Sequence, residues 1–157
     1  MIVLGIDPGT TRIGYGAIES SGSSLRHITS GILELTPKET DGERLDEIRT
    51  SLERLLLHIH PEKVGVERLF FSKNKKTALS VAEARGVLVA TVVHNKIPLF
   101  ELSPNEVKLA VTGNGASKKN EVAKMVSLLL HMDVSHLLDD ATDALAIAIA
   151  SSNKRLG

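Results

Sequence analysis

The chain has 157 residues, of which 42% are hydrophobic and 24% are charged, and its 19 basic side chains (lysine and arginine) balance 19 acidic ones. This length and composition predict one globular domain, residues 1–157, with a core of its own. The absence of cysteine excludes disulfides and thiolate metal sites, and no apolar run approaches the roughly 20 residues of a membrane span. We therefore expect a cytoplasmic protein with no membrane partner.

The first third of the chain predicts an antiparallel meander of three strands. Residues 2–7 are apolar on both faces, as in a central strand, and residues 14–19 and 25–35 form the second and third strands. Pro8 and Gly9 supply the first turn, and the serine-rich stretch 20–24 supplies the next.

The rest of the chain alternates helices with two short strands. Apolar residues at helical spacing predict a helix over 42–60, with Asp41 as N-cap and Pro61 as its stop. Further elements follow in chain order: a strand at 64–67, a helix at 77–94, a strand at 97–102, a short helix from Ser103-Pro104 to Gly113, and helices at 117–131 and 139–153. The order predicts an α/β fold, a mixed five-stranded sheet flanked by helices.

The helix at 77–94 is apolar almost all round, which predicts burial on more than one side. Ala78, Ala82 and Gly86 form a stripe of small residues that permits close approach of a second copy of the chain. A homodimer would bury this face, because a two-fold dimer matches the same surface on both subunits. The alternative is a helix enclosed in the core of a monomer.

Four acidic residues are predicted to converge. Asp7 and Glu67 each end a strand, and Asp140 and Asp143 lie three residues apart on one helix face. Carboxylates brought together repel one another unless a cation neutralises them. Oxygen ligands without histidine or cysteine favour Mg²⁺ or Mn²⁺, and a pair of such ions can clamp both reacting oxygens of a phosphodiester.

Each acid taken alone has a simpler interpretation. Asp7 before Pro-Gly can be a turn former, Glu67 a solvated strand end, and Asp139 or Asp140 a helix cap. Asp143 is less easily explained, because it is followed by the apolar run of a buried helix. The combination of the four is therefore more specific than any one of them.

Several motifs, in order along the chain, resemble the RuvC family of Holliday-junction resolvases. They are Gly5-Ile-Asp-Pro-Gly9, Gly14-Tyr-Gly16, Val66-Glu67, Ala84-Arg-Gly86 and the segment 140–147. The resemblance implies an RNase H-like fold, catalytic carboxylates at Asp7, Glu67, Asp140 and Asp143, and two Mg²⁺ ions per subunit, for which Mn²⁺ can substitute. Asp139 is then a cap, and Ile13 stands where many members have threonine.

The family resemblance also implies the biological setting. Members are dimers that cut four-way junction DNA by paired, symmetric nicks during homologous recombination and DNA repair, and they work with the RuvA and RuvB branch-migration proteins. Cleavage leaves a 5′-phosphate.

Basic residues near the acids predict a DNA interface. Phe70, Lys73, Lys75 and Lys76 follow Glu67 and can grip a strand through phosphates and a stacked base. By resemblance, Phe70 reaches the junction, and Lys108 and Lys119 lie near the scissile phosphate, with Lys119 assisting catalysis and Lys118 as its neighbour. The alternative is a core phenylalanine and solvated lysines.

Three rival functions are compatible with parts of the sequence. Residues 5–11 look like the first phosphate loop of sugar kinases, actin and Hsp70, but a second such loop is absent. A small RNase H-like nuclease acting on RNA has a similar opening. A DNA-binding module without catalysis would gain nothing from acids clustered near phosphates.

Overall fold

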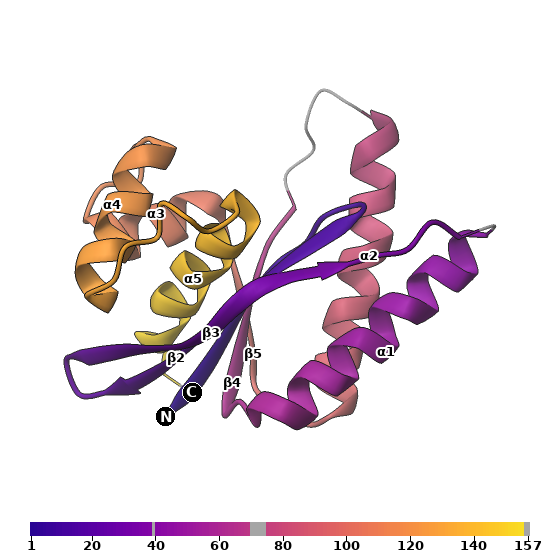
Figure 1. The fold of residues 1–157 in the computed structure, drawn as a ribbon, viewed down its shortest axis with the longest axis horizontal. Coiled ribbons are helices and arrows are strands. Elements are labelled where there is room, and N and C mark those ends of the chain that lie inside the picture. The colour runs from indigo at the N-terminus through magenta and orange to yellow at the C-terminus, as the bar shows by residue number, and fades with distance from the viewer. Residues whose placement is uncertain (39, 70–74, 156–157) are drawn as a thin grey trace.

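The computed structural model of the protein describes residues 1–38, 40–69 and 75–155. Its sheet has five strands in the order β3-β2-β1-β4-β5, shown edge-on in the middle of Figure 1. β1 pairs antiparallel with β2 and parallel with β4, so the predicted mixed sheet is confirmed. The strands are β1 (Ile2–Asp7), β2 (Arg12–Ser21), β3 (Ser24–Glu34), β4 (Lys63–Glu67) and β5 (Leu99–Leu102).

Helices cover both faces of this sheet (Figure 1). One face carries α1 (Asp41–Ile59) and α2 (Lys75–His94), and the other carries α3 (Pro104–Thr112), α4 (Lys119–Leu130) and α5 (Asp139–Ser152). Each face has its own buried cluster, because the sheet side chains alternate between the two. Leu4 and Ile6 belong to the α1–α2 side, whereas Val3 belongs to the α5 side.

Glycines let α5 lie directly on the sheet. A Cβ at Gly5 would overlap the carbonyl oxygen of Ala144, and one at Gly14 would overlap the carbonyl oxygen of Asp140. A Cβ at Gly16 would meet Leu145 at 2.8 Å. The motif glycines on β1 and β2 therefore set how close the first turns of α5 come to the end of β1, where Asp7 lies.

A buried lysine holds the opposite end of α5. Lys63, at the start of β4, is 3% exposed and donates hydrogen bonds to the carbonyl oxygens of Lys154 (2.6 Å) and Ser151 (3.4 Å). Its ammonium also lies 5.0 Å from the centre of the Phe100 ring. These contacts satisfy carbonyls that a helix end leaves open, and they attach α5 to the strand that ends at Glu67.

Two predicted caps were wrong by one residue. Thr40, rather than Asp41, caps α1, because its hydroxyl accepts from the Glu43 amide while the Glu43 carboxylate accepts from the Thr40 amide. Leu138 occupies the N-cap of α5 and makes no side-chain cap, so Asp139 is not the cap that we expected. Ser103 and Gly113 do bound α3 as predicted.

The single chain covers only part of α2, so the alternative of a helix enclosed in a monomer core was wrong, and burial of its second face against another copy stays a prediction. Only 22% of the stretch Lys76–His94 is buried, and that stretch has the length and apolar composition of a membrane span, which we had not expected. α2 contacts α1, but Leu79 and Val93 remain 65% and 57% exposed. Ala82, Gly86 and Ala90 are also exposed on this helix, so an apolar stripe faces outward.

Candidate active site

The sheet brings two of the predicted acids to one edge. Asp7 is the last residue of β1, and Glu67 is the last residue of β4. The two strands are parallel neighbours, with Ile6 paired to Val66 immediately before the acids. Asp7 and Glu67 therefore extend beyond the carboxyl ends of adjacent strands, where open α/β sheets place their ligands.

The other two acids come from the first turns of α5. Asp140 and Asp143 lie on the helix that packs over β1 and β2, and Asp7 is paired across the strands with Gly14, the glycine covered by the Asp140 backbone. The charges of Asp143, Glu67 and Asp140 all act on Asp7. The structure thus brings the four predicted carboxylates together.

Burial and crowding change how Asp7, Glu67 and Asp143 titrate. Burial, followed by the charges of Asp143, Glu67 and Asp140, raises the pKa of Asp7 from 3.8 to about 8. Burial and the charge of Asp143 also raise the pKa of Glu67, and burial raises that of Asp143. Without a cation, Asp7 therefore holds a proton at neutral pH, which a divalent ion would displace.

Basic residues offset part of the negative charge. The Lys119 ammonium, in the first turn of α4, lies 3.2 Å from Asp143 Oδ2 and 3.3 Å from Asp139 Oδ2. Burial lowers the pKa of Lys119, but the charges of Asp143 and Asp139 outweigh it and leave the pKa raised. Lys108 acts from α3 to lower the pKa of Glu67.

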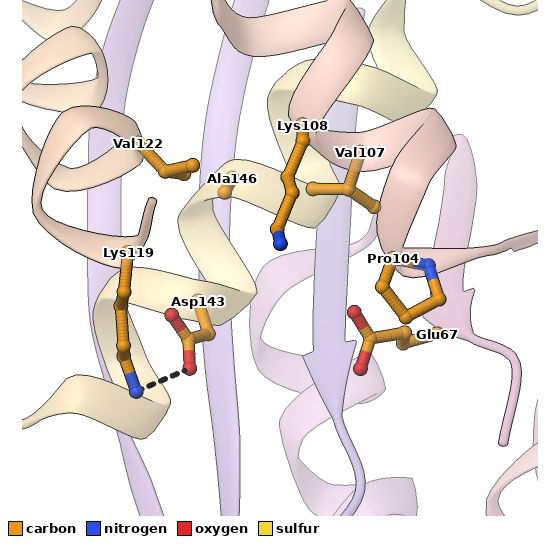
Figure 2. A pocket seen from close by; sticks show the side chains of 8 residues that line it. All are labelled: Glu67, Pro104, Val107, Lys108, Lys119, Val122, Asp143 and Ala146. Carbon is orange, nitrogen blue, oxygen red and sulfur yellow. Dashed lines mark ion pairs between the residues drawn. The ribbon is translucent and has the colours of Figure 1, made fainter. Parts of the chain in front are cut away.

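A pocket of about 240 Å³ opens between these residues, with Glu67, Asp143, Lys108 and Lys119 on its wall. Figure 2 shows Lys108 extending into it above the two carboxylates, and Lys119 paired with Asp143. The rest of the lining is apolar apart from the backbone and comes from Pro104, Val107, Val122 and Ala146. The pocket therefore combines acids that suit a metal with lysines that suit a phosphate.

The donor set suits Mg²⁺ or Mn²⁺, because it consists of carboxylate oxygens whose shared charge a divalent cation would relieve. Among the described residues, no three acidic or histidine side chains already form a compact ligand cluster. Instead, two of the acids each form an ion pair with a basic side chain. Lys119 pairs with Asp143, and Arg12 Nε lies 3.3 Å from Asp140 Oδ2.

Sequence reasoning missed two arginines at this site. Arg12, the first residue of β2, pairs with Asp140. Arg85 reaches from α2 to donate Nε–H to the backbone carbonyl of Glu67 at 3.0 Å, and its guanidinium also pairs with Glu101 on β5. The Ala84-Arg-Gly86 motif was the only signal for Arg85; nothing in the sequence pointed to Arg12.

Of the remaining predicted DNA-binding residues, the described Lys118 and Lys76 do not line the pocket. Lys118 is exposed at the N-cap of α4, where its backbone amide donates to Glu121 at 2.6 Å. Lys76 is exposed in the first turn of α2. Phe70 and Lys73 lie outside the described residues, and of Lys75 only the backbone is described.

Comparison with known proteins points to one family. A family model described as "Crossover junction endodeoxyribonuclease RuvC" matches residues 3–151. The protein of that name from Brachyspira hyodysenteriae is 42% identical over 154 residues, which cover 98% of this chain and 95% of the relative.

Solved structures of the same family also match this chain. The Thermus thermophilus RuvC structure has a TM-score of 0.86 and 32% identity, covering 97% of this chain and 93% of that one. The same protein in complex with a Holliday junction substrate has a TM-score of 0.85 and 30% identity, with the same coverage. These matches extend over nearly the whole chain and confirm the RNase H-like fold that the motifs implied.

Proposed function

Given that the chain belongs to the RuvC family of crossover junction endodeoxyribonucleases, we propose that Asp7, Glu67, Asp140 and Asp143 are the residues with which it resolves Holliday junctions. The observation that carries this proposal is the convergence of these acids, which raises the pKa of Asp7 to about 8. A folded protein retains such repulsion where function requires the charges to be close. Holliday-junction DNA is the substrate class of the family, and its nucleases depend on divalent metal.

The four carboxylates would hold two Mg²⁺ ions, with Mn²⁺ as a substitute. When bound, such ions activate water and stabilise the charge that develops on a phosphodiester undergoing in-line hydrolysis, which leaves a 5′-phosphate. Arg85 holds the Glu67 backbone and so positions that ligand. Mutual pairing with Lys119 orients Asp143.

Two lysines serve the substrate rather than the metal. Lys108 and Lys119 line the pocket beside the acids, so each can bind a non-bridging phosphate oxygen and neutralise charge in the transition state. Lys119 acts catalytically in this proposal, because it lies against Asp143. Lys73, Lys75, Lys76 and Lys118 would bind further phosphates of the DNA, and Phe70 would reach the bases at the junction.

We further propose that the chain works as a homodimer built on α2. The outward stripe of Leu79, Ala82, Gly86, Ala90 and Val93 is apolar and exposed in the single chain, and a two-fold axis along it would cover the stripe on both copies. A four-way junction also has two-fold symmetry, so two equivalent sites would make paired, symmetric nicks. Ala82→Arg should convert the dimer to monomers in analytical ultracentrifugation; an unchanged mass would refute this interface.

The wider setting follows from the same family membership. We propose that residues 1–157 act as one nuclease domain in the cytoplasm, in homologous recombination and DNA repair, together with RuvA and RuvB. A pull-down of purified RuvA and RuvB on a junction, with and without the protein, would test that association.

A gel assay tests the central proposal. Labelled four-way junction and linear duplex of the same sequence are incubated with the protein in Mg²⁺ or in chelator. We expect paired nicks on the junction alone, only with Mg²⁺, and none with Asp7→Asn, which should still bind the junction. Equal cutting of the duplex, or undiminished cutting by Asp7→Asn, would refute it.

A further inference from the structure

The packing of α5 on β2 places Arg12 at the rim of the carboxylate site. Alternate residues of a strand share a face, and Gly14 and Gly16 both lie beneath α5. Arg12 is the next residue on that face, just beyond the first turn of the helix. Its Nε consequently reaches Asp140 Oδ2 at 3.3 Å.

This ion pair is open to solvent. The Arg12 side chain is 52% exposed and that of Asp140 is 31% exposed. Glu34 lies directly across from Arg12 on β3, yet within the described residues the ion pair of Arg12 is with Asp140. Because exposed pairs contribute little to stability, Arg12 can exchange this partner for another anion at small cost.

The balance of charge indicates which anion that is. The four carboxylates face three basic side chains, namely Lys119 on Asp143, Arg12 on Asp140, and Lys108, whose charge acts on Glu67. Once divalent cations neutralise the acids, these basic groups are left with unbalanced positive charge at the mouth of the site. The DNA backbone supplies the matching phosphates, to which a guanidinium can bind through two hydrogen bonds.

We propose that Arg12 is a phosphate-binding residue that is held on Asp140 while DNA is absent and competes there with divalent metal. Junction binding draws Arg12 onto a phosphate and frees Asp140, so DNA and metal each strengthen the binding of the other. This inference rests on the proposed function, since it assumes that Asp140 is a metal ligand and that DNA is the substrate.

Two measurements that do not depend on cleavage test the inference with Arg12→Gln. The first is Mn²⁺ binding to the DNA-free protein, monitored through the electron paramagnetic resonance signal of the free ion. The substitution should make this binding about fivefold tighter, because it removes a positive charge near the metal ligand Asp140. In chelator, the slope of log K against log salt concentration for junction binding should fall by about 1, the loss of one phosphate contact. Arg12→Lys should restore most of that slope.

Arg26→Gln is the matched control. It removes the same charge from an exposed arginine–glutamate pair, with Glu19, at the far end of the same hairpin. It should alter neither Mn²⁺ affinity nor the slope.

Weaker Mn²⁺ binding by Arg12→Gln would overturn the proposal, since Arg12 would then be orienting Asp140 for metal. An unchanged salt slope would overturn the phosphate contact. If the wild-type protein fails to bind junctions at all, the proposed function fails, and the Mn²⁺ titration alone still decides whether Arg12 competes for Asp140.

Discussion

Replacing Asp7 by asparagine should stabilise the metal-free protein while abolishing cleavage. The pKa of Asp7 is raised from 3.8 to about 8 in the folded protein, so at pH 7 the unfolded chain is ionised there whereas the folded protein holds a proton. One pKa unit corresponds to 1.36 kcal/mol, so the ionisable Asp7 lowers the free energy of unfolding by at most about 4 kcal/mol at pH 7. Asp7 is partly exposed and shares its repulsion with the other three acids, which makes the loss smaller. We therefore expect Asp7→Asn to raise the free energy of unfolding by about 2 kcal/mol.

The pH dependence provides the assay. Because the folded state has the higher pKa, the wild-type protein loses this contribution to stability as the pH rises from about 4 to about 8. Urea unfolding in chelator should therefore show a gap between Asp7→Asn and wild type that is small near pH 4 and widest near pH 8.

Excess Mg²⁺ should close this gap, because metal stabilises only a protein that can bind it. Glu34→Gln, which removes an exposed strand-end acid, is the control and should show no such trend. A variant that is less stable than wild type at pH 8 in chelator would refute the electrostatic reasoning.

Three further substitutions test other parts of the account. Gly14→Ala should lower the free energy of unfolding in urea by about 1–3 kcal/mol and slow cleavage, because the added Cβ would overlap the Asp140 carbonyl oxygen. Gly42→Ala is the control and should leave the urea unfolding unchanged, because its Cβ would meet only Thr40 Oγ1, at 3.9 Å. Arg85→Gln removes the hydrogen bond to the Glu67 backbone and should weaken Mn²⁺ binding severalfold, whereas the control Arg49→Gln, at an exposed position, should not. Equal Mn²⁺ affinities for Arg85→Gln and wild type would mean that Arg85 has a structural role only. Lys119→Ala should lower the single-turnover rate about 10²-fold and junction affinity far less; matching losses would restrict Lys119 to binding.

Local patterns were sufficient to predict most of the fold. An apolar strand ending at Asp7 and a second ending at Glu67 could be predicted because both runs stop at a turn or a polar residue. Ser103-Pro104 and Gly113 bounded α3 correctly because N-caps and left-handed C-caps have strong residue preferences. The α1 cap was missed because Thr40 and Asp41 are both good caps, and Glu43 completes the capping box only with Thr40.

Contacts between distant segments could not be predicted. Arg12 and Asp140 are far apart in sequence, and their pairing depends on how closely α5 lies on β2. The partner that covers α2 could not be predicted for a related reason. A helix that is apolar all round must be covered, but the pattern does not show whether the same chain or a second copy covers it. Here α1 and the sheet cover one side, and the stripe around Ala82 and Gly86 stays exposed.

Cleavage by the proposed mechanism requires the four acids to be metal ligands. Crystals soaked in Mn²⁺ and measured at an absorption wavelength of manganese would locate the ions by anomalous scattering. We expect two peaks within coordination distance of Asp7, Glu67, Asp140 and Asp143, with Arg12 and Lys119 displaced from Asp140 and Asp143. Peaks elsewhere only, or no peak between these carboxylates at saturating Mn²⁺, would contradict the account.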